Sequence, residues 1–109
     1  MDSPDDLDGW ENVMARSQRT VTVVHRQGLH ARPAALFVQF AKRYASRVTV
    51  KKGRKIVDGK SIMGLLTLAA HAGARIVIVT DGSDAQEALE QLCQLVTEPL
   101  PEPSKSPHP

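Results

Sequence analysis

The sequence has little of what secreted and membrane-spanning proteins contain. Cys93 is the only cysteine among 109 residues, so no disulfide can form within the chain. The first ten residues, MDSPDDLDGW, are acidic and include neither the basic nor the apolar region of a secretory signal. No apolar run approaches the roughly 18 residues that a membrane-spanning helix needs. These absences predict a cytoplasmic protein that does not insert into a membrane.

Aromatic residues and metal-binding motifs are also scarce. The chain has one Trp, one Tyr and two Phe, so aliphatic side chains must form most of the core. A hydrophobic content of 41% in 109 residues is enough for one small domain. The four histidines and Cys93 show no spacing typical of metal ligands. We therefore predict no metal and no other cofactor.

Charge and proline are distributed unevenly and divide the chain into three parts. Residues 1–18 carry five acidic residues and one basic residue, which predicts a flexible N-terminal extension. Residues 19–96 carry twelve Lys and Arg against five Asp and Glu, and they form the predicted domain. Residues 97–109 contain five of the seven prolines, which predicts a disordered tail.

Hydrophobic periodicity within the predicted domain indicates four strands. Residues 20–25 and 47–51 alternate apolar and polar side chains, as half-buried strands do. A turn after the second strand leads into a short third strand that ends at Val57. Residues 75–80 are rich in β-branched side chains, which predicts a central strand.

Helical periodicity predicts three helices among these strands. The first begins after Gly28, and the second starts at Ser61 and ends before Gly73. A capping box within residues 83–87 starts the third helix, which places Cys93 in its buried stripe. The order βαββαβα predicts an α+β fold of two layers, with a four-stranded, mainly antiparallel sheet and three helices on one face.

A polar cluster, His-Ala-Arg-Pro, stands where the first helix should begin. The start of a helix has N–H groups without partners and a partial positive charge, so it can bind a phosphate. Arg32 can bind phosphoryl oxygens through two parallel hydrogen bonds, and a neutral imidazole such as that of His30 is a nucleophile. These residue types suit a histidine that carries a phosphoryl group. They equally fit an ordinary helix terminus with a solvated arginine.

Two motifs give the chain a resemblance to a known family. GLHARPA at 28–34, followed by KSIMG at 60–64, resembles the HPr family of histidine-containing phosphocarriers. These proteins serve the bacterial phosphoenolpyruvate-dependent phosphotransferase system, and the resemblance covers about residues 19–96. It implies an open-faced β-sandwich with strand order 1-4-2-3, and a carrier that has no turnover of its own.

The same resemblance implies partners and site residues. His30 would be phosphorylated at Nδ1 by enzyme I and would donate to enzyme IIA-type domains. Arg32 would stabilise that phosphate. Ser61 matches a regulatory serine that a kinase/phosphorylase modifies in some bacteria, and it is also a favourable N-cap worth about 1 kcal/mol. A phosphate there would add nearly two negative charges, which would repel an acidic partner.

The second predicted helix is too apolar for a single buried stripe. One face, sufficient for packing on the sheet, consists of Leu65, Leu68, Ala69 and Ala72. A second strip, which we expect to be exposed, consists of Ile62, Met63, Leu66 and Ala70. Exposed apolar strips are typical of transient protein interfaces. The resemblance makes Ile62, Met63 and Leu66 docking residues for enzyme I and its acceptors; alternatively, Ile62 and Met63 tuck under the first turn.

Eight of the twelve basic residues of the predicted domain lie between Lys42 and Lys60. No aromatic residue is interleaved with the run KKGRK, so we predict no nucleic-acid partner and interpret the run as a basic rim that steers acidic proteins. We expect His25 to be exposed at a strand end and His71 to lie near a helix C-terminus.

Two other functions remain compatible with the sequence. The chain could be a purely regulatory protein of the same fold that is switched through Ser61. It could also be a non-catalytic domain that binds a small molecule or a protein. In each case we expect a monomer.

Overall fold

The computed structural model describes residues 16–26 and 28–98, and these have the element order that the sequence predicts. The strands are β1 (Arg16–Thr22), β2 (Arg47–Lys52), β3 (Lys55–Asp58) and β4 (Arg75–Asp81). The helices are α2 (Ala31–Ala41), α3 (Ile62–Thr67) and α4 (Ala85–Thr97).

β4 lies inside a single antiparallel sheet whose strand order is β1-β4-β2-β3. Its side chains Ile76 and Ile78 are fully buried, which confirms the predicted central strand. β2 and β3 form a hairpin that turns at Gly53, whose φ of 60° suits glycine. The α+β fold and the strand order implied by the resemblance are both confirmed.

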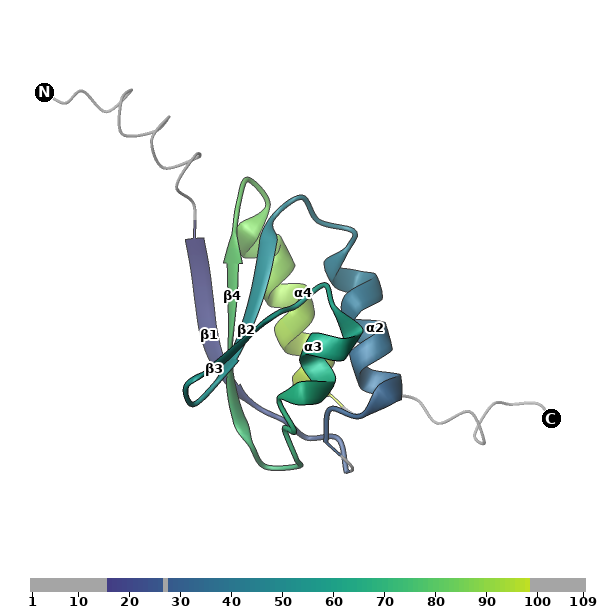
Figure 1. The fold of residues 1–109 in the computed structure, drawn as a ribbon. Coiled ribbons are helices and arrows are strands. Elements are labelled where there is room, and N and C mark those ends of the chain that lie inside the picture. Colours follow the sequence, from purple (N-terminus) through teal and green to yellow (C-terminus); the bar gives the residue numbers. More distant parts are fainter. Residues whose placement is uncertain (1–15, 27, 99–109) are drawn as a thin grey trace, which may run out of the picture.

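The three helices cover one face of the sheet and leave the other face open (Figure 1). Val48 and Val50 point from β2 into the core between the layers and are 1% and 0% exposed. The helices contribute the fully buried side chains of Phe37, Leu65 and Leu92. Burying each such side chain contributes roughly 1.5–3 kcal/mol, so this layer packing dominates the stability of the fold.

Cys93 belongs to this core, as the helical stripe of α4 predicts. It is buried together with Leu89, Leu92 and Val96. Burial raises the pKa of its thiol, although the nearby guanidinium of Arg19 acts in the opposite direction. The thiol therefore serves as a packing group.

β1 begins and ends earlier than the predicted strand over residues 20–25. After Thr22 the chain continues at the sheet edge, where Val23 accepts a hydrogen bond from the Gly73 amide (2.8 Å) and donates one to the Ala74 carbonyl (2.9 Å). Most of the predicted extension and tail lies outside the described residues. The described part starts with β1 at Arg16, and α4 continues to Thr97.

α3 is shorter than predicted, because it ends at Thr67 and not just before Gly73. Ala69 has a φ of 52°, a left-handed conformation that cannot continue a helix. The ammonium group of Lys55 donates to the Thr67 carbonyl at 2.8 Å and so binds one of the last carbonyls of α3.

The early end of α3 changes which of its neighbouring residues are buried. Leu65 and Leu68 pack into the core as expected. Ala69 and Ala72, expected on the same face, are exposed, and Ala70, expected in the exposed strip, is only 2% exposed. A helical wheel does not apply to residues 69–72, since they lie beyond the helix.

The predicted capping box of α4 does not form. Asp84 is the N-cap residue, but its side chain makes no cap hydrogen bond. Its carboxylate instead accepts hydrogen bonds from the amides of Ala45 (2.9 Å) and Ser46 (3.0 Å) and from the Ser46 hydroxyl. The bond from the Ser46 hydroxyl, followed by those from the amides, lowers the pKa of the Asp84 carboxyl. Residues 83–87 also allow a capping box of Ser83 with Gln86, but the Gln86 side chain bonds to Ser17 and Glu90.

Candidate functional site

The segment that joins β1 to α2 is held by a hydrogen bond within itself and by hydrogen bonds to two other parts of the fold. The Val24 amide donates to the Val96 carbonyl at the end of α4 (3.4 Å). The Gly28 amide donates to the His25 carbonyl within the segment (2.8 Å). The Leu29 amide donates to the Ala70 carbonyl after α3 (2.8 Å). These contacts fix the direction in which the chain enters α2.

Gly28 is required by this arrangement. Its φ is 77°, in the left-handed region that favours glycine. A Cβ atom at this position would lie 2.3 Å from the Ala70 oxygen and 2.7 Å from the His71 Cα. The glycine of GLHARPA therefore allows the segment before α2 to approach the backbone after α3.

His30 is the N-cap residue of α2. Its backbone is extended, with φ −95° and ψ −166°, and its side chain makes no cap hydrogen bond. The His30 amide donates to the Gly28 carbonyl, and its own carbonyl accepts from the Ala34 amide, both at 2.9 Å. The half-buried imidazole is thus held by its backbone at the partly positive end of an eleven-residue helix.

Arg32 and Pro33 follow His30 in the first turn of α2. Arg32 is exposed, whereas Pro33 is buried against the core side. Proline is tolerated here because its missing N–H would have no partner inside the helix. The structure therefore places an imidazole and a guanidinium on one helical turn, which is a suitable arrangement for binding a phosphoryl group.

Ser61 is the N-cap residue of α3, and its hydroxyl accepts a hydrogen bond from the Gly64 amide at 3.0 Å. The carbonyl of Ser61 also accepts the first bond of the helix, from the Leu65 amide (3.0 Å). The predicted cap is confirmed. Its hydroxyl is only half-buried, so a structural role does not exclude modification.

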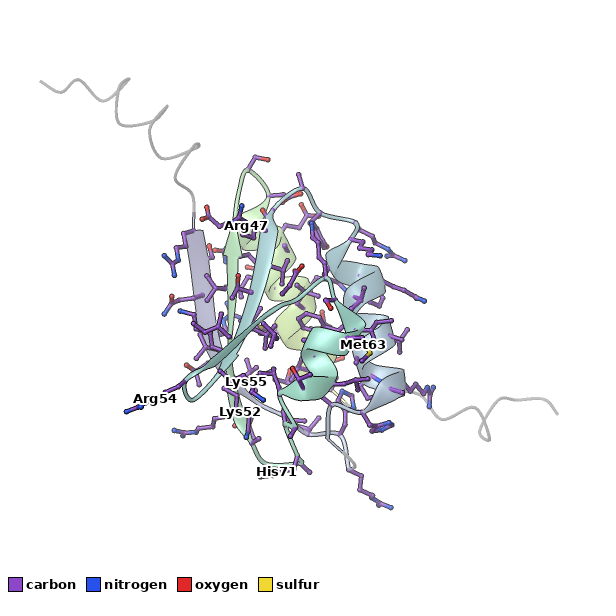
Figure 2. The ribbon with its side chains drawn as sticks, viewed as in Figure 1. Arg47, Lys52, Arg54, Lys55, Met63 and His71 are labelled. Atoms are coloured by element: carbon purple, nitrogen blue, oxygen red, sulfur yellow. The ribbon has the colours of Figure 1, made fainter. Side chains whose placement is uncertain are left out.

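α3 packs against α2 and exposes apolar side chains beside it. Met63 is 70% exposed and Ile62 is 40% exposed, so these side chains do not tuck under the first turn. Figure 2 labels Met63 on α3. Leu66 is half-buried and packs partly on the core, so it contributes less to the exposed strip.

Basic side chains gather at the hairpin between β2 and β3 (Figure 2). The figure labels Lys52, Arg54 and Lys55 there, and it labels Arg47 at the other end of β2. Part of the basic rim has structural contacts, since Lys55 binds the end of α3 and the Lys60 ammonium group donates to the Tyr44 carbonyl at 2.9 Å. Arg54, at the tip of the hairpin, is exposed to solvent.

The structure corrects the expectation for His25. This side chain is only 7% exposed, and its Nε2 lies 3.1 Å from the Leu95 carbonyl. The period-two alternation of Val21 and Val23 continues to residue 25, and this signal would have indicated an inward-facing imidazole. His71 is exposed, but it follows α3 at a distance of four residues and contacts the Ala72 carbonyl through Nδ1 (2.9 Å).

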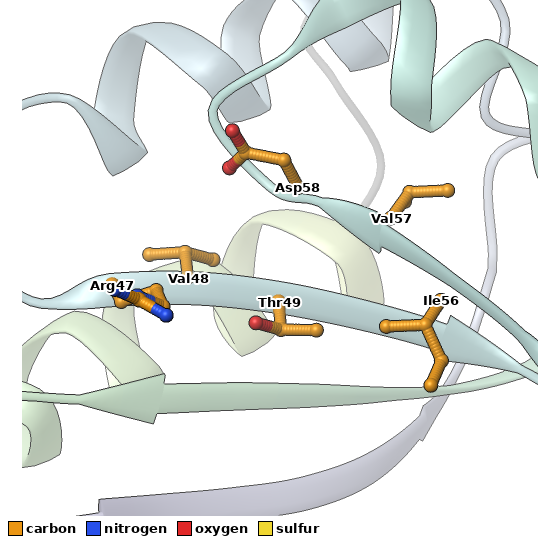
Figure 3. A pocket seen from close by; sticks show the side chains of 6 residues that line it. All are labelled: Arg47, Val48, Thr49, Ile56, Val57 and Asp58. Atoms are coloured by element: carbon orange, nitrogen blue, oxygen red, sulfur yellow. The ribbon is translucent and has the colours of Figure 1, made fainter.

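A hollow lies between β2 and β3 (Figure 3). Six side chains line it: Arg47, Val48, Thr49, Ile56, Val57 and Asp58. Within residues 16–26 and 28–98, no three His, Cys, Asp or Glu side chains come together as a metal site requires. No helix of this described part is long and apolar enough to cross a membrane.

Comparison with known proteins decides the family. Residues 17–98 match the model described as the PTS HPr component phosphorylation site. This match includes all four strands but the first residue of β1, all three helices, and both motifs. The chain belongs to the HPr family. Members of this family are phosphocarriers of the phosphotransferase system and are not themselves enzymes.

Individual relatives include both carrier and HPr-like proteins. The HPr-like protein Crh of Bacillus subtilis is 49% identical over 81 residues, which cover 74% of this chain and 95% of Crh. A crystal structure of HPr from Bacillus anthracis has a TM-score of 0.74 at 49% identity, covering 76% of this chain and 99% of that one. A crystal structure of Bacillus subtilis Crh is described as a domain-swapped, intertwined dimer. It has a TM-score of 0.61 at 51% identity, and the match covers 65% of this chain and 82% of that one.

Proposed function

We propose that this HPr-family protein accepts a phosphoryl group on Nδ1 of His30 from phosphorylated enzyme I and donates it to enzyme IIA-type domains. The observation that carries this proposal is the position of His30. Its imidazole stands at the N-terminus of α2 but makes no cap hydrogen bond, so it is not committed to holding the helix together. The family's carrier role makes this imidazole the natural acceptor.

The reaction exchanges one nitrogen–phosphorus bond for another. The lone pair of a neutral His30 Nδ1 attacks the phosphorus, and the bond between phosphorus and the donor imidazole of enzyme I breaks. The electron pair of that bond returns to the donor nitrogen. Fixed backbone and side-chain donors stabilise the charge of the transferring group, so catalysis consists mainly of positioning and electrostatics.

Arg32 is proposed to stabilise the phosphoryl group on His30. It is exposed and lies two residues after the histidine, in the first turn of the same helix. Its planar guanidinium can donate two parallel hydrogen bonds to phosphoryl oxygens, which a lysine cannot do.

The exposed apolar residues of α3 are proposed to dock the partner proteins. Ile62 and Met63 are exposed on α3, which contacts α2, and the N-cap residue of α2 is the proposed acceptor. Leu66 would form the half-buried base of this surface. The basic rim would then attract the acidic surface of a partner and raise the association rate at low salt.

A chase experiment tests this proposal. His30 is labelled from radioactive phosphoenolpyruvate with enzyme I, enzyme I is removed, and an enzyme IIA domain is added. We expect the label to move to the enzyme IIA domain. Retention of the label on the carrier would contradict the donor role.

Met63→Glu tests the docking surface. This substitution introduces a charge into an apolar interface, so it should raise the KM of enzyme I for this protein about tenfold or more.

A second, regulatory function has some support from a relative. Crh, at 49% identity, is called HPr-like, and its solution structure is described as that of a catabolite repression HPr. Phosphorylation of Ser61 by a seryl kinase would place negative charge beside the docking surface and slow phosphoryl acceptance at His30. Acid treatment separates the two functions, because phosphoserine is stable in acid and phosphohistidine is not.

We also propose that the protein is a cytoplasmic monomer, with a domain that includes Arg16–Gln18 in β1 and Thr97 in α4. The Crh dimer shows that this fold can exchange segments between copies. Light scattering at micromolar concentration should give the mass of one chain, and a mass of two chains would overturn this part of the proposal.

A further inference from the structure

His25 is a second imidazole near the proposed phosphorylation site, and the transfer chemistry does not use it. Its side chain is 93% buried, because only 7% is exposed. Nε2 lies 3.1 Å from the carbonyl oxygen of Leu95 in the last turn of α4. A carbonyl can only accept, so Nε2 carries the hydrogen and donates it. The Leu95 carbonyl is therefore the hydrogen-bond acceptor of the His25 side chain.

The Leu95 carbonyl belongs to a helix end that has few partners of its own. The last four carbonyl groups of a helix have no N–H donor inside the helix. Two consecutive residues of the β1–α2 segment use this end: the Val24 amide donates to the Val96 carbonyl, and His25 donates to Leu95. The segment is thereby attached to α4 by one backbone bond and one side-chain bond.

A short series of backbone bonds connects His25 to His30. The His25 carbonyl accepts from the Gly28 amide at 2.8 Å, and the Gly28 carbonyl accepts from the His30 amide at 2.9 Å. The Leu29 amide is held in the other direction by Ala70. Moving His25 away from α4 would thus shift the residues that set the backbone conformation of His30.

We propose that His25 is a positioning residue, which holds the backbone of His30 in the geometry for phosphoryl transfer by anchoring the β1–α2 segment to the end of α4. This inference rests on the proposed phosphocarrier function. His25 does not contact the phosphoryl group in this role. It acts through the Gly28 turn, and the docking surface on α3 is a separate part of the molecule.

Three substitutions at His25 separate positioning from packing. His25→Leu fills a similar volume but removes the donor, and His25→Asn introduces an amide that is too short to reach Leu95. His25→Gln can place an amide N–H close to the position of Nε2. We expect Leu and Asn to lower kcat for transfer from enzyme I about tenfold to a hundredfold, as misplacement of a reacting group does. KM should stay unchanged, and Gln should restore most of the rate.

Thr80→Val is a matched control. Thr80 is fully buried and donates a hydrogen bond to the Ala85 carbonyl at 2.7 Å, at the opposite end of α4. Its loss should lower the urea midpoint as a His25 substitution does, but it should leave kcat unchanged. Equal kcat losses in Thr80→Val and His25→Leu would overturn the positioning role, as would a His25→Asn protein that transfers at the wild-type rate.

NMR spectra of the unphosphorylated proteins give a second readout that does not depend on enzyme I. The backbone amide signals of residues 28–31 and the ring signals of His30 should shift in His25→Asn, return in His25→Gln and stay in place in Thr80→Val. Unchanged His30 signals in His25→Asn would refute the inference. A wild-type protein that is not phosphorylated by enzyme I would refute the proposed function and leave this spectral test valid.

Discussion

α2 and α3 each begin at a residue that we propose is phosphorylated, but the side chains of these two residues make different contacts. The Ser61 hydroxyl accepts a hydrogen bond from the Gly64 amide and so caps α3. The His30 imidazole makes no cap bond at α2. The Ser61 side chain stabilises its helix by capping it, whereas the His30 side chain occupies the same N-cap position without a cap bond. An N-cap side chain can thus stabilise the helix, or it can remain available for another interaction.

The surroundings of the two residues support this contrast. α3 is a six-residue helix that depends on Ser61 at its start and on Lys55 at its end. α2 has eleven residues and is held from the core by Phe37 and Val38, so it tolerates an uncapped first turn. The longer, better-packed helix carries the proposed phosphoryl acceptor, His30.

His30→Ala gives the largest expected effect. All phosphorylation from phosphoenolpyruvate and enzyme I should be lost, while the free energy of unfolding changes little because no cap bond is removed. Intact mass spectrometry and urea denaturation measure the two quantities. Full labelling of this variant at another residue would contradict the role of His30, and a large loss of stability would contradict the contrast with Ser61.

Arg32→Ala should slow transfer through His30 about tenfold or more, since it removes donors that stabilise the transferring group. Arg32→Lys should restore only part of this rate, because lysine lacks the planar fork. Rapid-quench measurements of the single-turnover rate test both variants. Equal rates for all three proteins would show that the guanidinium is not engaged.

Ser61→Ala should show the opposite pattern to His30→Ala. Loss of the cap should lower the free energy of unfolding by about 1 kcal/mol. Phosphorylation of His30 should continue at nearly the wild-type rate. If Ser61→Ala leaves the urea midpoint unchanged, the hydroxyl does not have the capping role that its geometry indicates.

Asp84 provides the smallest effect and a third helix terminus for comparison. Its carboxyl pKa is lowered, chiefly by the Ser46 hydroxyl. A lowered pKa contributes stability above the unfolded-state value, near 3.9, and this contribution is lost as pH falls through the folded-state value. Asp84→Asn should therefore flatten the decline of stability below about pH 4. An unchanged acid profile would contradict this assignment.

Much of the fold follows from the sequence because its strands and helices have clear periodicity. The strands around Val48, Val50 and Ile76, the stripe containing Cys93, and the cap at Ser61 all follow from local pattern. His30 could also be placed at the start of α2, because an apolar helix follows its polar cluster directly.

The sequence-based predictions were wrong where tertiary contacts decide the local structure. α3 ends early because the backbone of residues 69–71 turns to meet Gly28, and helical periodicity does not indicate such a contact. Asp84 binds Ala45 and Ser46, which are distant in sequence, and so does not form the local capping box. His25 is buried because the end of α4 offers a carbonyl to it.

The most direct test is intact mass spectrometry of the wild-type protein after incubation with phosphoenolpyruvate and purified enzyme I. Phosphoryl transfer through His30 at the N-terminus of α2 predicts the gain of one phosphoryl group. This added mass should be lost after brief acid treatment and should be absent in His30→Ala. A protein that gains no mass, or one whose added group survives acid, would contradict phosphoryl transfer through His30.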